Sequence, residues 1–333
     1  MATAPPRWRY VLLGLAALLL VPATPFLPVL APAAQALVLL VPAFAACALV
    51  GWWYGGRLSV ALVWLLLAAW VVGQPIPGAA AYGWLVRGWS VLLAGVFGAF
   101  CVLRPRQNFL AQALPTVGVS LLIGMLALLT VNGPVGDQLG RTLLAEYADR
   151  TTQWTVLLDR LTSTPEWTTY FAKSPEALAL RQQVLSEYGR MPARSLTVLP
   201  AMLALESLAA LAVAWALFQR LARSRIGPPL APLQEFRFSD QLIWGLVVGV
   251  TLLVLPAFAE VREAAINLLV FFGALYVVRG LGVLSWMLAP RRWTKALLVA
   301  VGLLAWQLLA TLALALGVGD TWLDWRRRTR PTS

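Results

Sequence analysis

The sequence predicts an all-α fold, a polytopic bundle of about eight or nine transmembrane helices with an extramembrane helical insertion. Of the 333 residues, 60% are hydrophobic and only 12% are charged, about half the charged fraction of a soluble domain. The apolar residues form runs of roughly 20, enough for a helix to cross a hydrocarbon core about 30 Å thick. One polar segment of mixed charge interrupts these runs. The three observations together predict a membrane protein.

The apolar runs divide the chain into three parts. Residues 1–131 form an N-terminal bundle of about five spans, residues 132–194 an extramembrane amphipathic region, and residues 195–333 a C-terminal bundle of about four spans with a basic tail. The predicted spans are, in order, Tyr10–Leu30, Ala34–Tyr54, Leu58–Val72, Ala81–Leu103, Leu110–Val131, Leu196–Phe218, Gln241–Phe258, Ala264–Leu288 and Ala296–Gly317.

The first span is broken by prolines in its second half. Broken backbone at membrane depth must face protein or a cavity, because lipid cannot satisfy its hydrogen bonds. A secretory signal peptide with cleavage near Ala34-Gln35-Ala36 is the alternative. Since the apolar character continues without a polar break to Val50, we favour an uncleaved span. The prolines are Pro22, Pro25, Pro28 and Pro32.

Residues 132–194 differ from the rest of the chain. Seven acidic and seven basic residues are scattered through them, with apolar residues at helical spacing. This pattern is typical of amphipathic helices outside the bilayer. Two interpretations stay open, a lid or docking platform and a simple long connection.

Basic residues set the orientation, since they collect in cytoplasmic loops. Arg57, Arg104 and the loop Arg220–Arg237 fall on the same side as the N-terminus, which is therefore predicted to be cytoplasmic. An odd number of spans would place the arginines after Asp324 outside, against this rule. Either the tail is an exception to the rule, or one run crosses only half the membrane, with the first and the seventh as the candidates.

Composition argues against several functions. The chain has no histidine, and Cys47 and Cys101 form no CxxC pair, so we expect no metal site, no cofactor and no enzymatic activity. The net charge of +12 is explained by membrane topology, and we expect the lipid bilayer as partner rather than nucleic acid. Asp320 and Asp324, beside an arginine run, are interpreted as a solvated membrane edge.

Ionisable side chains inside a bilayer are costly, which makes each a functional hypothesis. Glu206 and Arg279 lie within predicted spans at similar depth, and we expect them to pair. They either coordinate a substrate or a proton, or form a buried ion pair that fixes helix register. Asn267 and Gln307 are weaker ligand-binding candidates, with interhelical hydrogen bonds as the alternative.

Small residues recur at every fourth position in two spans. They are Ala43, Cys47, Gly51 and Gly55 in one, and Ala94 and Gly98 in the other. This pattern lets helices approach closely. It predicts packing within the chain, with docking against another membrane subunit as the alternative.

The C-terminal hundred residues carry short motifs, namely Phe236-Arg237-Phe238, Asn267, Gly280-Leu281, Gly317-Val318-Gly319-Asp320 and Asp324-Trp325-Arg326. In these the chain resembles the YybS-like family of uncharacterised bacterial membrane proteins (DUF2232). That family is in turn similar to the substrate-binding components of energy-coupling-factor transporters. The resemblance implies a bacterial inner-membrane location, a small-molecule pocket and a docking face. The docking alanines of those components, four apart on the first helix, are missing here.

We therefore expect an inner-membrane protein that binds a small ligand or a lipid, with the fold of a transporter component. The alternative is a non-transporting scaffold or regulatory protein that acts through its external helical region.

Overall fold

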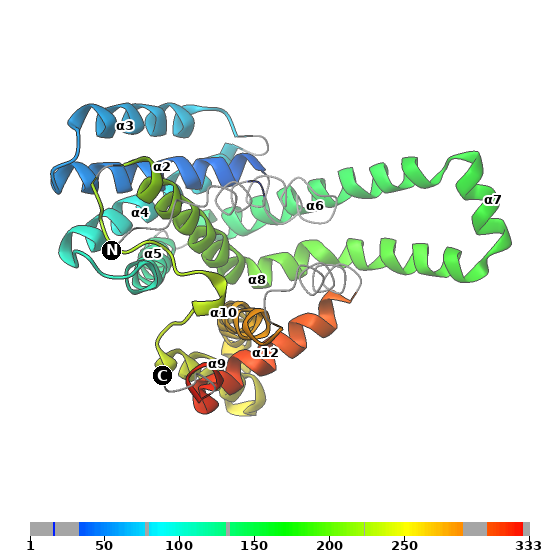
Figure 1. Ribbon diagram of the computed structural model, residues 1–333. Coiled ribbons are helices and arrows are strands. Elements are labelled where there is room, and N and C mark those ends of the chain that lie inside the picture. Colours follow the sequence, from blue (N-terminus) through cyan, green and yellow to red (C-terminus); the bar gives the residue numbers. More distant parts are fainter. Residues whose placement is uncertain are drawn as a thin grey trace. The chain divides into compact units, whose positions relative to one another are not determined.

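The computed structural model describes Ala16 and residues 33–76, 80–130, 134–222, 224–288 and 305–328. All regular structure in these ranges is helical (Figure 1). The predicted first span, with its prolines, lies outside them, as do Arg291, Arg292 and Lys295. The chain forms two compact units, one of residues 1–197 and 206–229, the other of residues 198–205 and 230–333.

The first unit is built around α2 (Ala33–Trp53), which packs against α3 (Leu58–Gly73) and α4 (Ala80–Leu103). α4 packs in turn against α5 (Phe109–Thr130). The outer surface of α3 is apolar, with Val63, Leu66 and Trp70 each more than half exposed. Such a surface suits contact with lipid.

The predicted stripe of small residues on α2 is partly a packing surface. Ala43 and Cys47 are fully buried, and a Cβ on Gly51 would lie 2.4 Å from Cζ of Phe218. Gly55 differs, because it lies exposed in the turn after α2 with φ +91° and no atom near its Cβ position. Its role is conformational, since glycine adopts positive φ without steric cost.

The stripe on α4 packs within the first unit. Ala94 is 9% exposed. A Cβ on Gly98 would lie 3.8 Å from Cβ of Ala46 on α2, an ordinary contact. Gly98 thus contacts α2 without steric conflict.

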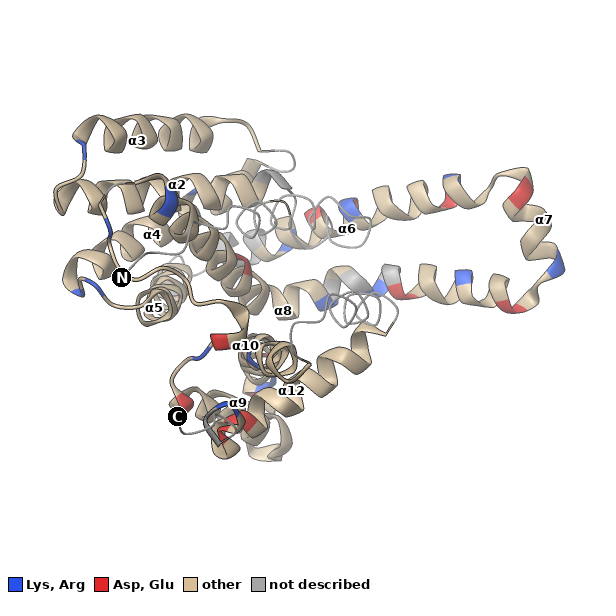
Figure 2. Cartoon of the chain, in the orientation of Figure 1, with Lys and Arg blue, Asp and Glu red and all other residues tan. Residues whose placement is uncertain are grey.

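A helical hairpin follows, formed by α6 (Pro134–Thr162), α7 (Pro165–Lys173) and the first part of α8 (Pro175–Leu221) (Figure 1). Charged residues of both signs are spread along it (Figure 2). The boundary predicted at residue 194 is not an element boundary, because α8 continues across it. One helix of 47 residues thus replaces the separate amphipathic and membrane helices that the sequence predicts.

The second unit contains α9 (Ile243–Val254), α10 (Arg262–Met287), α12 (Trp306–Leu323), α13 (Trp325–Arg328) and three 3-10 turns, η1 (Leu233–Glu235), η2 (Asp240–Leu242) and η3 (Pro256–Val261). α10 packs against both α9 and α12. Two glycines allow the closest approach. A Cβ on Gly280 would lie 1.7 Å from the Ala313 carbonyl oxygen, and one on Gly317 would lie 2.0 Å from that of Tyr276.

Five helical segments among the described residues are long and apolar enough to cross a membrane. They are Gln35–Trp53, Ala80–Leu103, Phe109–Leu128, Arg194–Leu221 and Pro256–Met287. Leu58–Gly73 and Asp240–Val254 are shorter. The number of eight or nine is therefore not confirmed. α9 has 12 residues, about 18 Å at 1.5 Å per residue, so the predicted seventh span, Gln241–Phe258, is too long.

Candidate functional site

Glu206 belongs to a buried polar cluster of the first unit. Nε2 of Gln35 on α2 donates to Glu206 Oε2 over 2.7 Å, and the Tyr82 hydroxyl on α4 donates to Oε1 of Gln35. Gln35 and Tyr82 are 5% and 4% exposed. The other carboxylate oxygen of Glu206, Oε1, is buried without a hydrogen-bond partner.

Arg150 of α6 completes this cluster. Its Cζ lies 4.5 Å from the centre of the Tyr82 ring, and its Nε donates to Glu146 Oε1 over 3.0 Å. Burial lowers the pKa of Arg150, but the effect of the neighbouring Tyr82 and Glu146, which raise this pKa, is larger. The net change in the pKa is therefore upward. Arg150 therefore stays charged, and its Nη1 is buried without a hydrogen-bond partner.

The sequence predicted Glu206 but not its neighbours. The one available signal was Gln35, a polar residue inside an apolar run, interpreted as part of a possible cleavage site. Arg150 lies in the segment of mixed charge, where its periodicity does not distinguish it from exposed arginines. The cluster can hold opposite charges at low dielectric, which suits recognition of a polar group or register between helices.

Arg279 lies in a different network, in the second unit. Its Nε donates to Asp320 Oδ2 over 3.0 Å and its Nη1 to Asp240 Oδ1 over 2.7 Å. Arg326 shares Asp320, with Nη2 2.6 Å from Oδ2. Arg279 and Glu206 thus each have partners within their own unit, in place of the ion pair that the sequence predicts.

Asp320 is the centre of this network and not a solvated residue. It is 1% exposed, with Arg279 at 2% and Arg326 at 6%. Only the Arg237–Asp324 pair, with both side chains one-third exposed, fits the predicted membrane edge. Three of the motifs that carried the resemblance contribute to this network, through Phe236, Asp320 and Arg326. The network joins η1, η2, α10, α12 and α13.

Asn267 and Gln307 serve different purposes. The N–H of Ala201 on α8 donates to Oδ1 of Asn267 over 2.9 Å, an interhelical hydrogen bond. This donor directly follows Pro200, and a proline disturbs the backbone hydrogen bonds of its helix. Gln307 lies exposed near the start of α12, away from the ionic network.

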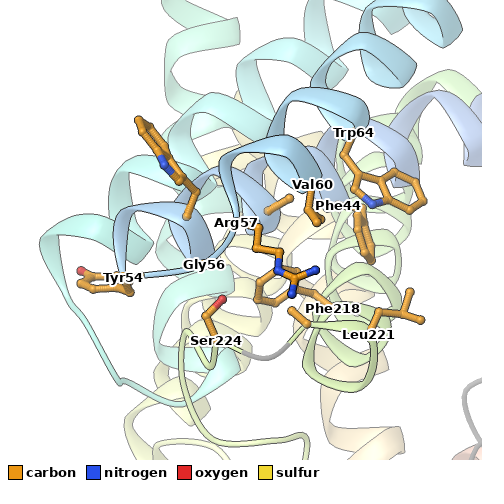
Figure 3. A pocket seen from close by; sticks show the side chains of 13 residues that line it. Phe44, Tyr54, Gly56, Arg57, Val60, Trp64, Phe218, Leu221 and Ser224 are labelled. Carbon is orange, nitrogen blue, oxygen red and sulfur yellow. The ribbon is translucent and has the colours of Figure 1, made fainter.

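A cavity of about 500 Å³ lies in the first unit, where the end of α2, the following turn, the start of α3 and the end of α8 meet. Figure 3 shows the Arg57 side chain reaching from this turn toward Phe218 and Ser224. Phe44 packs against Trp64, with ring centres 4.1 Å apart and ring planes inclined by 45°. None of the four predicted ligand-binding residues lines this cavity. The sequence did not reveal it because its walls come from segments far apart in the chain.

Residues 173–321 match a family model described as Predicted membrane protein (DUF2232). The matched range includes all of α8 and α10 and the ionic network as far as Asp320. With the five long apolar helices, this match supports a location in a membrane. No curated protein and no solved structure was found to match the chain. The similarity to energy-coupling-factor components gains no support from these comparisons.

The described residues contain no group of three or more histidine, cysteine or acidic side chains placed to hold a metal ion. Both cysteines are buried and free.

Proposed function

We propose that this chain is a multi-pass protein of the bacterial inner membrane that binds a small amphipathic molecule in the first-unit cavity. The observation that carries this proposal is the cavity itself. Its volume of about 500 Å³ lies within the range of about 300–1,000 Å³ typical of ligand pockets. Five aromatic side chains line it, together with Arg57 and Ser224.

The position of the cavity supports an occupant taken from the bilayer. Trp52 and Tyr54 lie at the end of α2, where aromatic residues mark the level of the lipid headgroups. The neighbouring surface of α3 is apolar and exposed. An amphipathic molecule can place its polar group in the cavity and its apolar part along this helix. A part in transport, as the family resemblance implies, belongs to the same proposal.

A matched pair of variants tests this function. Val60 lines the cavity, whereas Val63, on the same helix, does not; both are exposed. Val60→Trp fills part of the cavity, and Val63→Trp adds the same bulk outside it. We expect mass spectrometry of detergent-purified protein to find a retained small molecule in wild type and Val63→Trp but not in Val60→Trp. Equal retention in all three proteins would refute the proposed site.

A second candidate function is docking through the hairpin of α6, α7 and α8. Leu161, Trp167, Tyr170 and Leu180 are each about half exposed or more, although the hairpin is predicted to lie in water. Exposed apolar side chains on a soluble surface often mark a protein interface. A photo-crosslinking residue at position 161 is expected to capture another protein in intact cells. Crosslinks to lipid alone would rule out this candidate.

A further inference from the structure

Arg57 is the charged group of the first-unit cavity, and the elements around it carry no acid to neutralise it. The chain has no acidic residue before Asp137 and none between Glu206 and Glu235. α2, the following turn, α3 and the cavity-lining end of α8 therefore contribute none. By contrast, Arg150, Arg279 and Arg326 each pair with a carboxylate.

The cavity combines aromatic and polar groups. Phe44, Trp64 and Phe218 contribute aromatic rings, with the rings of Phe44 and Phe218 6.0 Å apart. Arg57 and Ser224 contribute a guanidinium and a hydroxyl group, and Figure 3 shows the Arg57 side chain next to Phe218 and Ser224. A Cβ on Gly56 would lie 2.8 Å from Oγ of Ser224, so the glycine lets this hydroxyl approach the turn closely. The arrangement matches a molecule with one anionic end.

We propose that the cavity binds a membrane amphiphile through a phosphate-bearing headgroup, with Arg57 as the principal contact. This inference rests on the proposed function and specifies its ligand. A guanidinium presents two parallel N–H donors that match phosphate or carboxylate oxygens. A phosphate has further oxygens, and the Ser224 hydroxyl supplies a donor for one of them.

General attraction between a basic protein and anionic lipid is the competing explanation. Arg225 provides the matched control, because it is exposed, lies one residue from Ser224 and does not line the cavity. Arg57→Gln and Arg225→Gln remove the same charge from the same region. A difference between them therefore reports on the cavity and not on the net charge.

The experiment titrates the delipidated full-length protein with phosphatidylglycerol and with phosphatidylcholine of identical acyl chains, and measures bound lipid by native mass spectrometry. We expect wild type to prefer phosphatidylglycerol, Arg57→Gln to bind it about ten- to a hundredfold more weakly, and Arg225→Gln to stay within about twofold of wild type. Arg57→Lys, which keeps the charge but loses the two-pronged donor, is expected to be intermediate. Equal unfolding temperatures exclude misfolding of the variants.

Inorganic phosphate as competitor distinguishes the two sources of the headgroup chemistry. Displacement of the lipid by millimolar phosphate would show that a water-soluble phosphate compound is sufficient to occupy the cavity. If phosphate did not displace the lipid, the lipid itself would be identified as the ligand. Wild type without preference between the two lipids, or equal losses in Arg57→Gln and Arg225→Gln, would overturn the inference. If the inference failed in this way but Val60→Trp abolished binding of both lipids, the proposed function of the cavity would still hold. If the protein bound no amphiphile at all, both the proposed function and the inference about its ligand would be refuted.

Discussion

Asp320 accepts hydrogen bonds from two buried arginines, Arg279 and Arg326. In Asp320→Asn the shape of the side chain is kept, but two guanidinium groups lose their shared negative charge. Removing one partner of a buried ion pair costs about 3–5 kcal/mol, so we expect a loss of about 3 kcal/mol or more in the free energy of unfolding. Thermal or denaturant unfolding in detergent measures it.

Asp324→Asn is the control for this change. The Arg237–Asp324 pair is one-third exposed on both sides, and exposed pairs contribute about 0–1 kcal/mol. Asparagine also tolerates the left-handed backbone of residue 324. Equal losses in the two variants would show that Asp320 is not the centre of the network.

Asn267 is expected to stabilise the helix around Pro200. Asn267→Ala leaves the N–H of Ala201 without the acceptor that it has in the structure. Interhelical hydrogen bonds in membranes average about 0.6 kcal/mol, so the expected loss is of that order. In the Pro200→Ala background this N–H can bond within α8, and Asn267→Ala should cost less. A double-mutant cycle of unfolding free energies measures the coupling; additive losses would contradict this role.

At the scale of elements, the α10–α12 crossing depends on Gly280. Alanine there would place Cβ 1.7 Å from a backbone oxygen of α12, so the helices must separate. We expect Gly280→Ala to destabilise the second unit by about 2 kcal/mol. Gly273→Ala, on the same helix with no atom within 4 Å, is expected to be neutral or slightly stabilising. Differential scanning fluorimetry of both variants checks the prediction, which equal unfolding temperatures would contradict.

Helix positions followed well from hydropathy where an apolar run ends in arginine, glycine or proline. α4 and α5 begin and end within one residue of the predicted Ala81–Leu103 and Leu110–Val131. The length of α9 was overestimated because the apolar composition continues past Pro256, although the backbone there forms a 3-10 helix. The prediction divided α8 into two parts because the composition changes near residue 194. The helix itself does not end there.

The candidate site was less predictable than the helices. Glu206 was found because a carboxylate in an apolar run is unusual. Gln35 was interpreted as part of a possible cleavage site, and Arg150 resembles the other charged residues of its segment, so neither was predicted to lie beside Glu206. The cavity depends on contacts between α2 and α8, and a pattern along one helix carries no information about such a pairing.

At the scale of the whole molecule, the contacts of the arginine tail predict on which side of the membrane the C-terminus lies. Nη1 of Arg326 donates to the backbone carbonyls of Gln234 and Phe236, within the basic loop predicted to be cytoplasmic. We therefore expect the C-terminus on the cytoplasmic side, with α9 as a half-span. A C-terminal alkaline phosphatase fusion should be inactive and a fluorescent-protein fusion bright. The opposite pattern would place the tail outside.

The hairpin of α6, α7 and α8 carries charges of both signs along its length (Figure 2), and residues 132–194 hold seven acidic and seven basic residues. Moving one net charge across a membrane potential involves about 2.3 kcal/mol of electrical work per 100 mV. With equal numbers of both signs, the predicted placement of this segment outside would need almost no net electrical work. The rest of the chain carries the full net charge of +12. In the predicted topology, the membrane potential would therefore act on the basic loops and leave the export of the hairpin electrically neutral.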